Sequence, residues 1–135
     1  MRWTLFVALV LSACCTMRGF LAGISFELSQ EAADALVQGR ADLRTCFNGT
    51  CWDETYVPDA GPSINEGLSF DETSRTLWMK QWASPGNTAD VTLTATRDGG
   101  VLFTREWTGV KFIHKFPNGE LCGGDGYVPE GTVKF

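Results

Sequence analysis

Histidine is nearly absent from this chain of 135 residues, which contains one, His114. Enzymes that activate a serine or cysteine nucleophile commonly use histidine as the base, and the Gly-x-Ser-x-Gly motif of hydrolases is missing as well. Zinc binding is disfavoured because Cys46 and Cys51 have no second pair at metal-ligand spacing. We therefore expect no catalytic residue, no metal site and no cofactor.

Basic residues are few and scattered. Lys and Arg number 11 against 16 Asp and Glu, so the formal charge is −5. Binding of nucleic acid needs clustered basic residues, and no basic run occurs, so nucleic acid is not an expected partner. The apolar run at residues 3–11 is too short for a transmembrane helix, which needs roughly 18 apolar residues.

A short signal follows this apolar run. Arg2 precedes it, and small residues lead from its end to a cysteine. The order Leu11-Ser12-Ala13-Cys14 resembles the lipobox of bacterial lipoproteins. The resemblance covers residues 1–14 and implies cleavage before Cys14, which would carry a diacylglycerol and a palmitate. It also implies a protein anchored by lipid to the cell membrane or outer membrane and facing away from the cytoplasm.

Two other interpretations of the N-terminus remain. An ordinary secretory signal would release the protein, although Leu11 at position −3 fits that cleavage poorly. A retained N-terminal segment is the third interpretation. The lipoprotein interpretation divides the chain into a signal peptide (1–13), a lipidated tether (14–23) and one domain (24–135). Such a tether spans at most about 30 Å.

The domain has the sequence pattern of an all-β protein. Short stretches of alternating apolar and polar residues are separated by turns rich in Gly, Pro and Asn, which favours an antiparallel β-sandwich. One short helix is expected at 30–38, with Ser29 as its cap. The expected strands are 24–28, a hairpin within 43–57, 68–70, 76–82, 91–96, 101–108, 110–116 and 132–135.

Two further resemblances concern the domain. The threonine-rich strand at 91–96, the turn Asp98-Gly99-Gly100 and the strand after it look like those of immunoglobulin or fibronectin type III modules. The cysteine hairpin and the late motif Pro117-Asn118-Gly119-Glu120-Leu121-Cys122 are similar to those of small bacterial surface lipoproteins of uncharacterised function. These resemblances imply an immunoglobulin-like sandwich and bring no known activity.

Cys46 and Cys51 are the expected disulfide pair. They flank Asn48-Gly49, the strongest short signal for a two-residue hairpin turn, which places the cysteines directly opposite each other. Disulfides are the usual state of cysteines outside the cytoplasm. Cys122 stays open: it is free, or it pairs with Cys15.

Neither the carboxylates nor the single histidine indicates a catalytic site. Asp53-Glu54 and Asp71-Glu72 are adjacent pairs, and adjacent residues of a strand point to opposite faces. His114 is in phase with the apolar residues around it, which is typical of a hydrogen-bonded core residue.

The tryptophans at 78 and 82 support one binding hypothesis. Strand alternation places Trp78, Lys80 and Trp82 on one face and Leu77 and Met79 on the other. If the second face is buried, the first forms an exposed stripe that can bind a sugar or a peptide. Alternatively the tryptophans are core and the other pair lies under a loop. Trp52 and Trp107 are expected to be packed.

The sequence thus favours a non-catalytic lipoprotein with a binding or structural role in the cell envelope. Its expected partners are the membrane, through the lipid, and a cell-wall glycan or an envelope protein. A carbohydrate- or peptide-binding module using the tryptophan stripe is the first alternative. A small envelope enzyme using acidic residues is the second.

Overall fold

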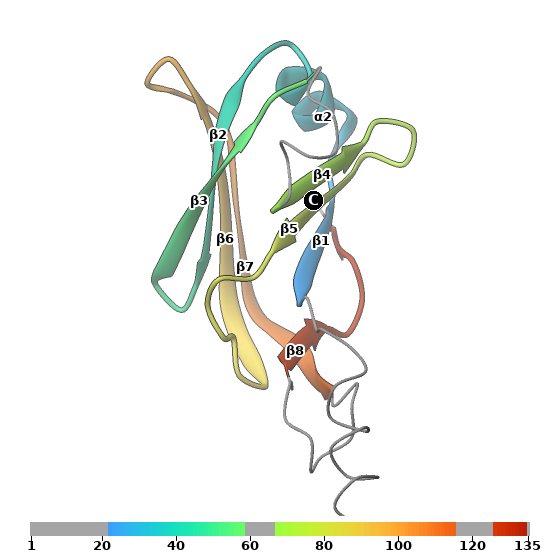
Figure 1. Cartoon of the computed structure of the whole chain (residues 1–135), viewed down its shortest axis with the longest axis vertical. Helices are drawn as coiled ribbons and strands as arrows, with labels where there is room; N and C mark the ends of the chain where they lie inside the picture. The colour runs from blue at the N-terminus through green and yellow to red at the C-terminus, as the bar shows by residue number, and fades with distance from the viewer. Residues whose placement is uncertain (1–21, 59–66, 116–125, 135) are drawn as a thin grey trace, which may run out of the picture.

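The computed structural model of this chain describes residues 22–58, 67–115 and 126–134. In this part of the chain, the strands form two β-sheets, and one short helix accompanies them (Figure 1). The all-β prediction is therefore confirmed. The elements are β1 (Gly23–Glu27), α2 (Gln30–Leu36), β2 (Ala41–Phe47), β3 (Thr50–Tyr56), β4 (Leu68–Asp71), β5 (Thr76–Lys80), β6 (Thr88–Arg97), β7 (Gly100–Lys115), β8 (Gly126–Pro129) and β9 (Val133–Lys134).

The two sheets face each other across the hydrophobic core (Figure 1). The four-stranded sheet has the order β4-β5-β1-β9, and the five-stranded sheet has the order β3-β2-β6-β7-β8. Each sheet buries every second residue of its central strands, as period-2 sequences require: β1 and β5 in the four-stranded sheet, β2 and β6 in the five-stranded one. One buried polar side chain joins the layers, because Thr45 Oγ1 lies 3.2 Å from Met79 Sδ. The largest buried side chains are Phe26, Phe47, Ile24, Leu28, Leu36, Leu43, Leu68, Leu77, Met79, Leu93 and Val91.

The β2–β3 hairpin has the predicted register. Cys46 is paired with Cys51, and Phe47 is paired with Thr50. The two turn residues, Asn48 and Gly49, both have positive φ angles, of 51° and 88°, as a type I′ turn requires. Asn48 also holds the hairpin against β6: its Oδ1 accepts a hydrogen bond of 2.8 Å from the backbone N–H of Asp90.

The helix α2 begins where predicted, because Ser29 Oγ accepts a hydrogen bond from the N–H of Ala32. It ends at Leu36, earlier than the predicted residue 38. At this end the guanidinium of Arg97, from β6, donates to the carbonyl oxygens of Ala35, Leu36, Gly39 and Arg40. A cation from a distant strand therefore caps the helix C-terminus.

The strands predicted at 101–108 and 110–116 are one continuous strand, β7, so the predicted break is wrong. Gly109, at the predicted break, has a φ of 65° and donates its N–H to Asp90 Oδ1 at 2.9 Å. The register between β6 and β7 shifts beside it, between Ala89 and Val91. Glycine in a strand often marks such a bulge, which bends the strand without ending it.

The strand predicted at 132–135 is observed as β9, which pairs in parallel with β1. Trp107, on β7, donates from Nε1 to the carbonyl oxygen of Lys134 at 2.8 Å. This bond ties β9 to the opposite sheet.

Several predictions concern residues outside the described part of the chain. These are the lipobox with its lipid-attachment residue Cys14, most of the tether, Cys15, Cys122, Phe116 and most of the turn-rich segment after residue 58.

Candidate functional site

The face of β5 that is buried is the one carrying Leu77 and Met79, both with 0% exposure. Trp78 and Lys80 point away from the core and are half-buried. The interpretation in which the tryptophans are core residues is therefore wrong for this strand. β5 ends at Lys80, whereas the predicted strand extends to residue 82. Trp82 therefore does not continue the stripe along the strand, contrary to the prediction, and lies in the loop that leads to β6.

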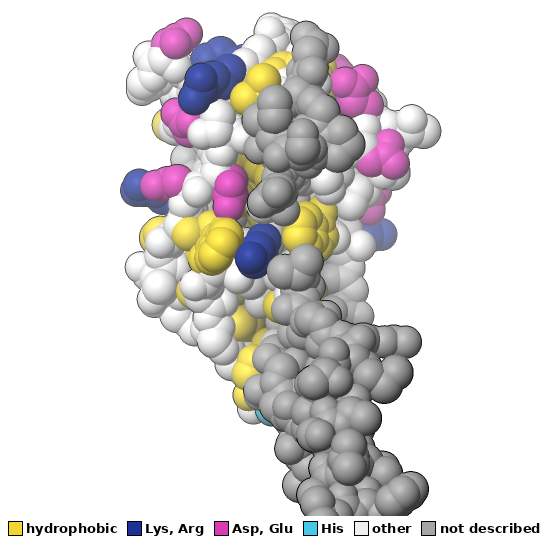
Figure 2. Space-filling view, in the orientation of Figure 1, with side chains coloured by type: hydrophobic (Ala, Val, Ile, Leu, Met, Phe, Trp, Pro, Cys, Tyr) yellow, Lys and Arg dark blue, Asp and Glu magenta, His cyan; other side chains and the backbone are white. Residues whose placement is uncertain are grey.

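Trp82 is the most exposed tryptophan in the described chain, with 60% of its surface accessible. Its orientation is nevertheless fixed by two contacts. Its Nε1 donates a hydrogen bond of 2.8 Å to Glu54 Oε1, and the ammonium of Lys80 lies 4.0 Å from the centre of its ring. Figure 2 shows hydrophobic side chains on either side of a basic one at mid-height on this face. An aromatic surface that is both exposed and held in place is suited to stacking on a ligand.

Two glycines make room for this arrangement. Lys80 pairs with Gly23 of β1 and donates its backbone N–H to the carbonyl oxygen of Gly67, just before β4. A Cβ atom on Gly23 would overlap the indole of Trp78, and one on Gly67 would lie 2.5 Å from Glu54 Oε1. The residues on either side of Lys80 in the sheet therefore have no side chain of their own. Trp78 and Glu54 occupy the positions that a Cβ atom on Gly23 and Gly67 would take.

We call Glu54, Trp78, Lys80 and Trp82 the Trp82 site. A groove of about 290 Å³ adjoins it. The groove is lined by Ala22, Gln81, Trp82, Ala83, Ser84, Pro85 and Tyr127. The site thus combines an aromatic surface, one cation, one carboxylate and a neighbouring groove with amide and hydroxyl groups.

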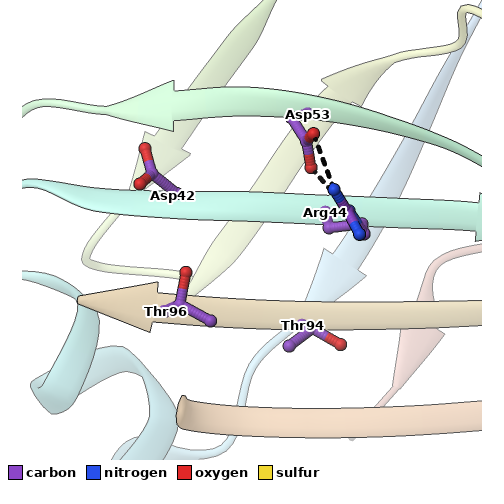
Figure 3. Close-up of a pocket in the computed structure, with 5 residues that line it drawn as sticks. All are labelled: Asp42, Arg44, Asp53, Thr94 and Thr96. Atoms are coloured by element: carbon purple, nitrogen blue, oxygen red, sulfur yellow. Dashed lines mark hydrogen bonds and ion pairs between the residues drawn. The ribbon is translucent and has the colours of Figure 1, made fainter. Parts of the chain in front are cut away.

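A second depression, of about 550 Å³, lies on the outer face of the five-stranded sheet (Figure 3). Arg44 of β2 binds Asp53 of β3 through two hydrogen bonds, of 2.8 and 3.1 Å. These bonds lower the pKa of the Asp53 carboxyl and raise the pKa of Arg44. Asp42 accepts a hydrogen bond from Thr55 Oγ1. Because both charges of the ion pair already have partners, this depression is the weaker candidate for a ligand site.

The acidic pairs divide as strand geometry requires. Asp53 lies on the outer face of its sheet, whereas Glu54 is turned toward the four-stranded sheet and Trp82. Asp71 accepts a hydrogen bond from the backbone N–H of Thr73 and so shapes the β4–β5 turn. Among the described residues, no three His, Cys, Asp or Glu side chains gather as metal ligands.

Cys46 and Cys51 form the predicted disulfide. The distance between their Cα atoms is 4.0 Å, somewhat shorter than the 4.5 Å typical of such opposed residues. His114 is half-buried and stacks on Tyr127, with ring centres 4.4 Å apart. Trp52 and Trp107 are packed, as predicted: Trp52 against Phe47 and Trp107 against Phe26.

Three residues of the site region were not singled out from the sequence: Glu54 as a partner of Trp82, Gly23 and Gly67. The sequence shows Glu54 only as half of the acidic pair Asp53-Glu54. Its role depends on which loop lies beside β3, and nothing in the local pattern reveals that. The glycines carry a weak signal, because a glycine in or beside a strand often marks the close approach of another group.

No protein-family model matches the chain, and it has no match among curated proteins or solved structures. Within the described residues, no helix has the length and apolar character needed to cross a membrane.

Proposed function

We propose that this chain is a non-catalytic lipoprotein of the cell envelope whose outward-facing domain binds carbohydrate at the Trp82 site. The observation that carries the proposal is the state of Trp82. The residue is 60% exposed, and its ring is held by Glu54 and Lys80. An exposed tryptophan usually needs a reason, because burying an indole contributes a large hydrophobic stabilisation.

Carbohydrate fits the site better than an apolar ligand. A sugar ring presents C–H groups to an aromatic face and hydroxyl groups at its edges. The indole can stack on the C–H groups, and Glu54 and Ser84 can hydrogen-bond the hydroxyls. The site and its adjoining groove therefore offer both kinds of contact.

The strand order supports an immunoglobulin-like sandwich as the scaffold. In such domains one sheet has the order A-B-E-D, and the other contains C′, C, F and G. The order β9-β1-β5-β4 takes the places A-B-E-D, and β3-β2-β6-β7 takes the places C′-C-F-G. Strands β1 to β7 then follow one another as B to G. Four features depart from the pattern: β8 adds a strand beside β7, β9 is parallel to β1, α2 lies between β1 and β2, and the disulfide joins neighbouring strands.

The lipid anchor rests on the motif Leu11-Ser12-Ala13-Cys14. With Cys14 lipidated, the tether would reach at most about 30 Å from the membrane to the domain. Ala22 lines the groove beside Trp82. The site would therefore lie on the side of the domain where the tether joins it, close to the envelope surface.

Binding is tested with a glycan array and a peptidoglycan pull-down on the full domain. Trp82→Ala should abolish the signal, while Trp82→Phe, which keeps an aromatic face, should retain part of it. Loss of a central aromatic contact commonly costs about 2 kcal/mol or more of binding energy. The melting temperature should change little for either variant, because the ring is mostly exposed. Binding to peptides but not to glycans would replace carbohydrate by a peptide ligand, and binding that survives Trp82→Ala would remove the site.

Anchoring is tested by expressing the chain in a bacterium and partitioning the extract with detergent. The intact protein should enter the detergent phase, and Cys14→Ser should move it to the aqueous phase or mislocalise it. Cys15→Ser is the matched control and should leave partitioning unchanged. Detergent partitioning that is the same for Cys14→Ser and the intact chain would contradict the lipid anchor.

A further inference from the structure

We propose that the sugar bound at the Trp82 site carries a negative charge and that Lys80 binds it. This inference rests on the proposed carbohydrate-binding function and specifies the ligand class. It follows from the surroundings of Lys80, which differ from those of the basic residues that form ion pairs.

Lys80 is a half-buried cation without an acidic partner among the described residues. Arg44 pairs with Asp53, and Arg75 and Lys134 both pair with Glu27. Lys80 instead has the face of Trp82, at 4.0 Å. A contact with an aromatic face engages the ammonium from one side only and leaves N–H donors for another acceptor.

The sheet neighbours of Lys80 contribute no side chain of their own beside it. Its paired neighbour on β1 is Gly23, and its backbone partner on the other side is Gly67. No side chain from either residue covers the ammonium. Trp78 lies across Gly23, so that apolar surface is present close to the cation. A ligand can therefore contact an aromatic ring and the charge together.

Glu54 is hydrogen-bonded to Trp82 rather than paired with Lys80. Its Oε1 accepts the hydrogen bond of Trp82 Nε1, and no ion pair joins its carboxylate to Lys80. The positive and negative groups thus lie at different parts of the indole, the cation over the ring and the carboxylate at its N–H. This polarity would orient a ligand with its anion toward Lys80 and a hydroxyl donor toward Glu54.

The test compares three sugars that share one ring: N-acetylglucosamine, N-acetylmuramic acid and N-acetylglucosamine 6-phosphate. The first is neutral, the second carries a carboxylate and the third a phosphate. Each is titrated into the labelled domain while the indole N–H signal of Trp82 is followed by NMR. At least one anionic sugar should bind about fivefold more tightly than the neutral one, as one exposed charge pair allows. Which of the two binds better identifies the anion.

Substitutions test whether Lys80 causes the preference for an anionic sugar. Lys80→Gln should bring the Kd of the anionic sugar to that of the neutral one, and Lys80→Arg should retain the preference. Lys111→Gln removes an exposed lysine of β7 and should change neither Kd. The preference should also shrink as salt rises. Equal binding of all three sugars, or a preference that persists in Lys80→Gln, would overturn the role of Lys80. Failure of all three sugars to bind would instead count against carbohydrate recognition itself.

Discussion

Arg97 donates a hydrogen bond from Nη2 to the backbone carbonyl oxygen of Leu36, at a distance of 3.1 Å. This bond connects the end of the strand β6 with the last residue of the helix α2. The same guanidinium reaches three more carbonyl groups, of Ala35, Gly39 and Arg40. The seven-residue helix has no basic residue in its own last turn, so Arg97 supplies the missing cap.

Removing this cap should destabilise the domain. Arg97→Met keeps the apolar stem but leaves the helix carbonyl groups without their donor. Hydrogen bonds to a charged group contribute about 1.5–3 kcal/mol, and we expect the free energy of unfolding in urea to fall within that range. Arg40→Met is the matched control, since the Arg40 side chain is exposed and only its carbonyl takes part. Equal losses in the two variants would show that the cap contributes nothing specific.

A second prediction concerns the two type I′ turns. Asn48 and Asp98 both have φ near 50° at the first turn position, so alanine should introduce similar backbone strain at each. Only Asn48→Ala also removes the bond from the backbone N–H of Asp90. We expect Asn48→Ala to cost about 1 kcal/mol more than Asp98→Ala in chemical unfolding. Equal costs would mean that the cross-strand bond is energetically neutral.

The pair of Arg44 and Asp53 should produce a pH dependence. The folded state lowers the pKa of Asp53, so the stabilisation is present above the unfolded-state pKa and is lost as pH falls through the folded-state pKa. Arg44→Gln should raise the Asp53 pKa toward its ordinary value in a carbon-detected NMR titration. It should also flatten the acid limb of the stability curve. Identical titrations of Asp53 in the two proteins would show that the ion pair does not persist in solution.

The disulfide should contribute little to the stability and to the register of the β2–β3 hairpin. It closes a loop with a sequence separation of 5, so removing it costs about 2 kcal/mol or less in unfolded-state entropy. The double variant Cys46→Ser/Cys51→Ser should keep its hairpin register, because the Asn48-Gly49 turn and the contact of Phe47 with Trp52 remain. Cross-strand nuclear Overhauser effects between positions 46 and 51 check this. Their loss in an otherwise folded domain would show that the disulfide sets the register.

Local patterns in the sequence predicted the features that depend on neighbouring residues. Alternation in the strand predicted at 91–96 places Val91, Leu93 and Ala95 on one face and the threonines on the other, and the first three all have 0% exposure. The Asn48-Gly49 turn predicted the pairing of Cys46 and Cys51 because a two-residue turn determines the register of its strands.

The remaining features depend on residues that are far apart in the sequence. Nothing near Gly109 indicates that β7 continues through it, because the continuation relies on Asp90 of another strand. The end of α2 depends on Arg97, and the position of Trp82 depends on Glu54. Alternation predicts that Trp82 lies near Lys80, as it does, but not that it lies in a loop. The position of a loop residue is determined by its contacts rather than by strand periodicity. The candidate site was therefore half predictable: its aromatic and basic members were, and its carboxylate and glycines were not.

The parallel pairing of β9 with β1 has a consequence for folding. The partner strands come from opposite ends of the described chain, so the four-stranded sheet is complete only after both strands have been synthesised. Until then β1 presents a bare edge that another chain can join. Contacts of such wide sequence separation also slow folding. The domain is therefore most exposed to aggregation in the interval after β1 has folded and before β9 pairs with it.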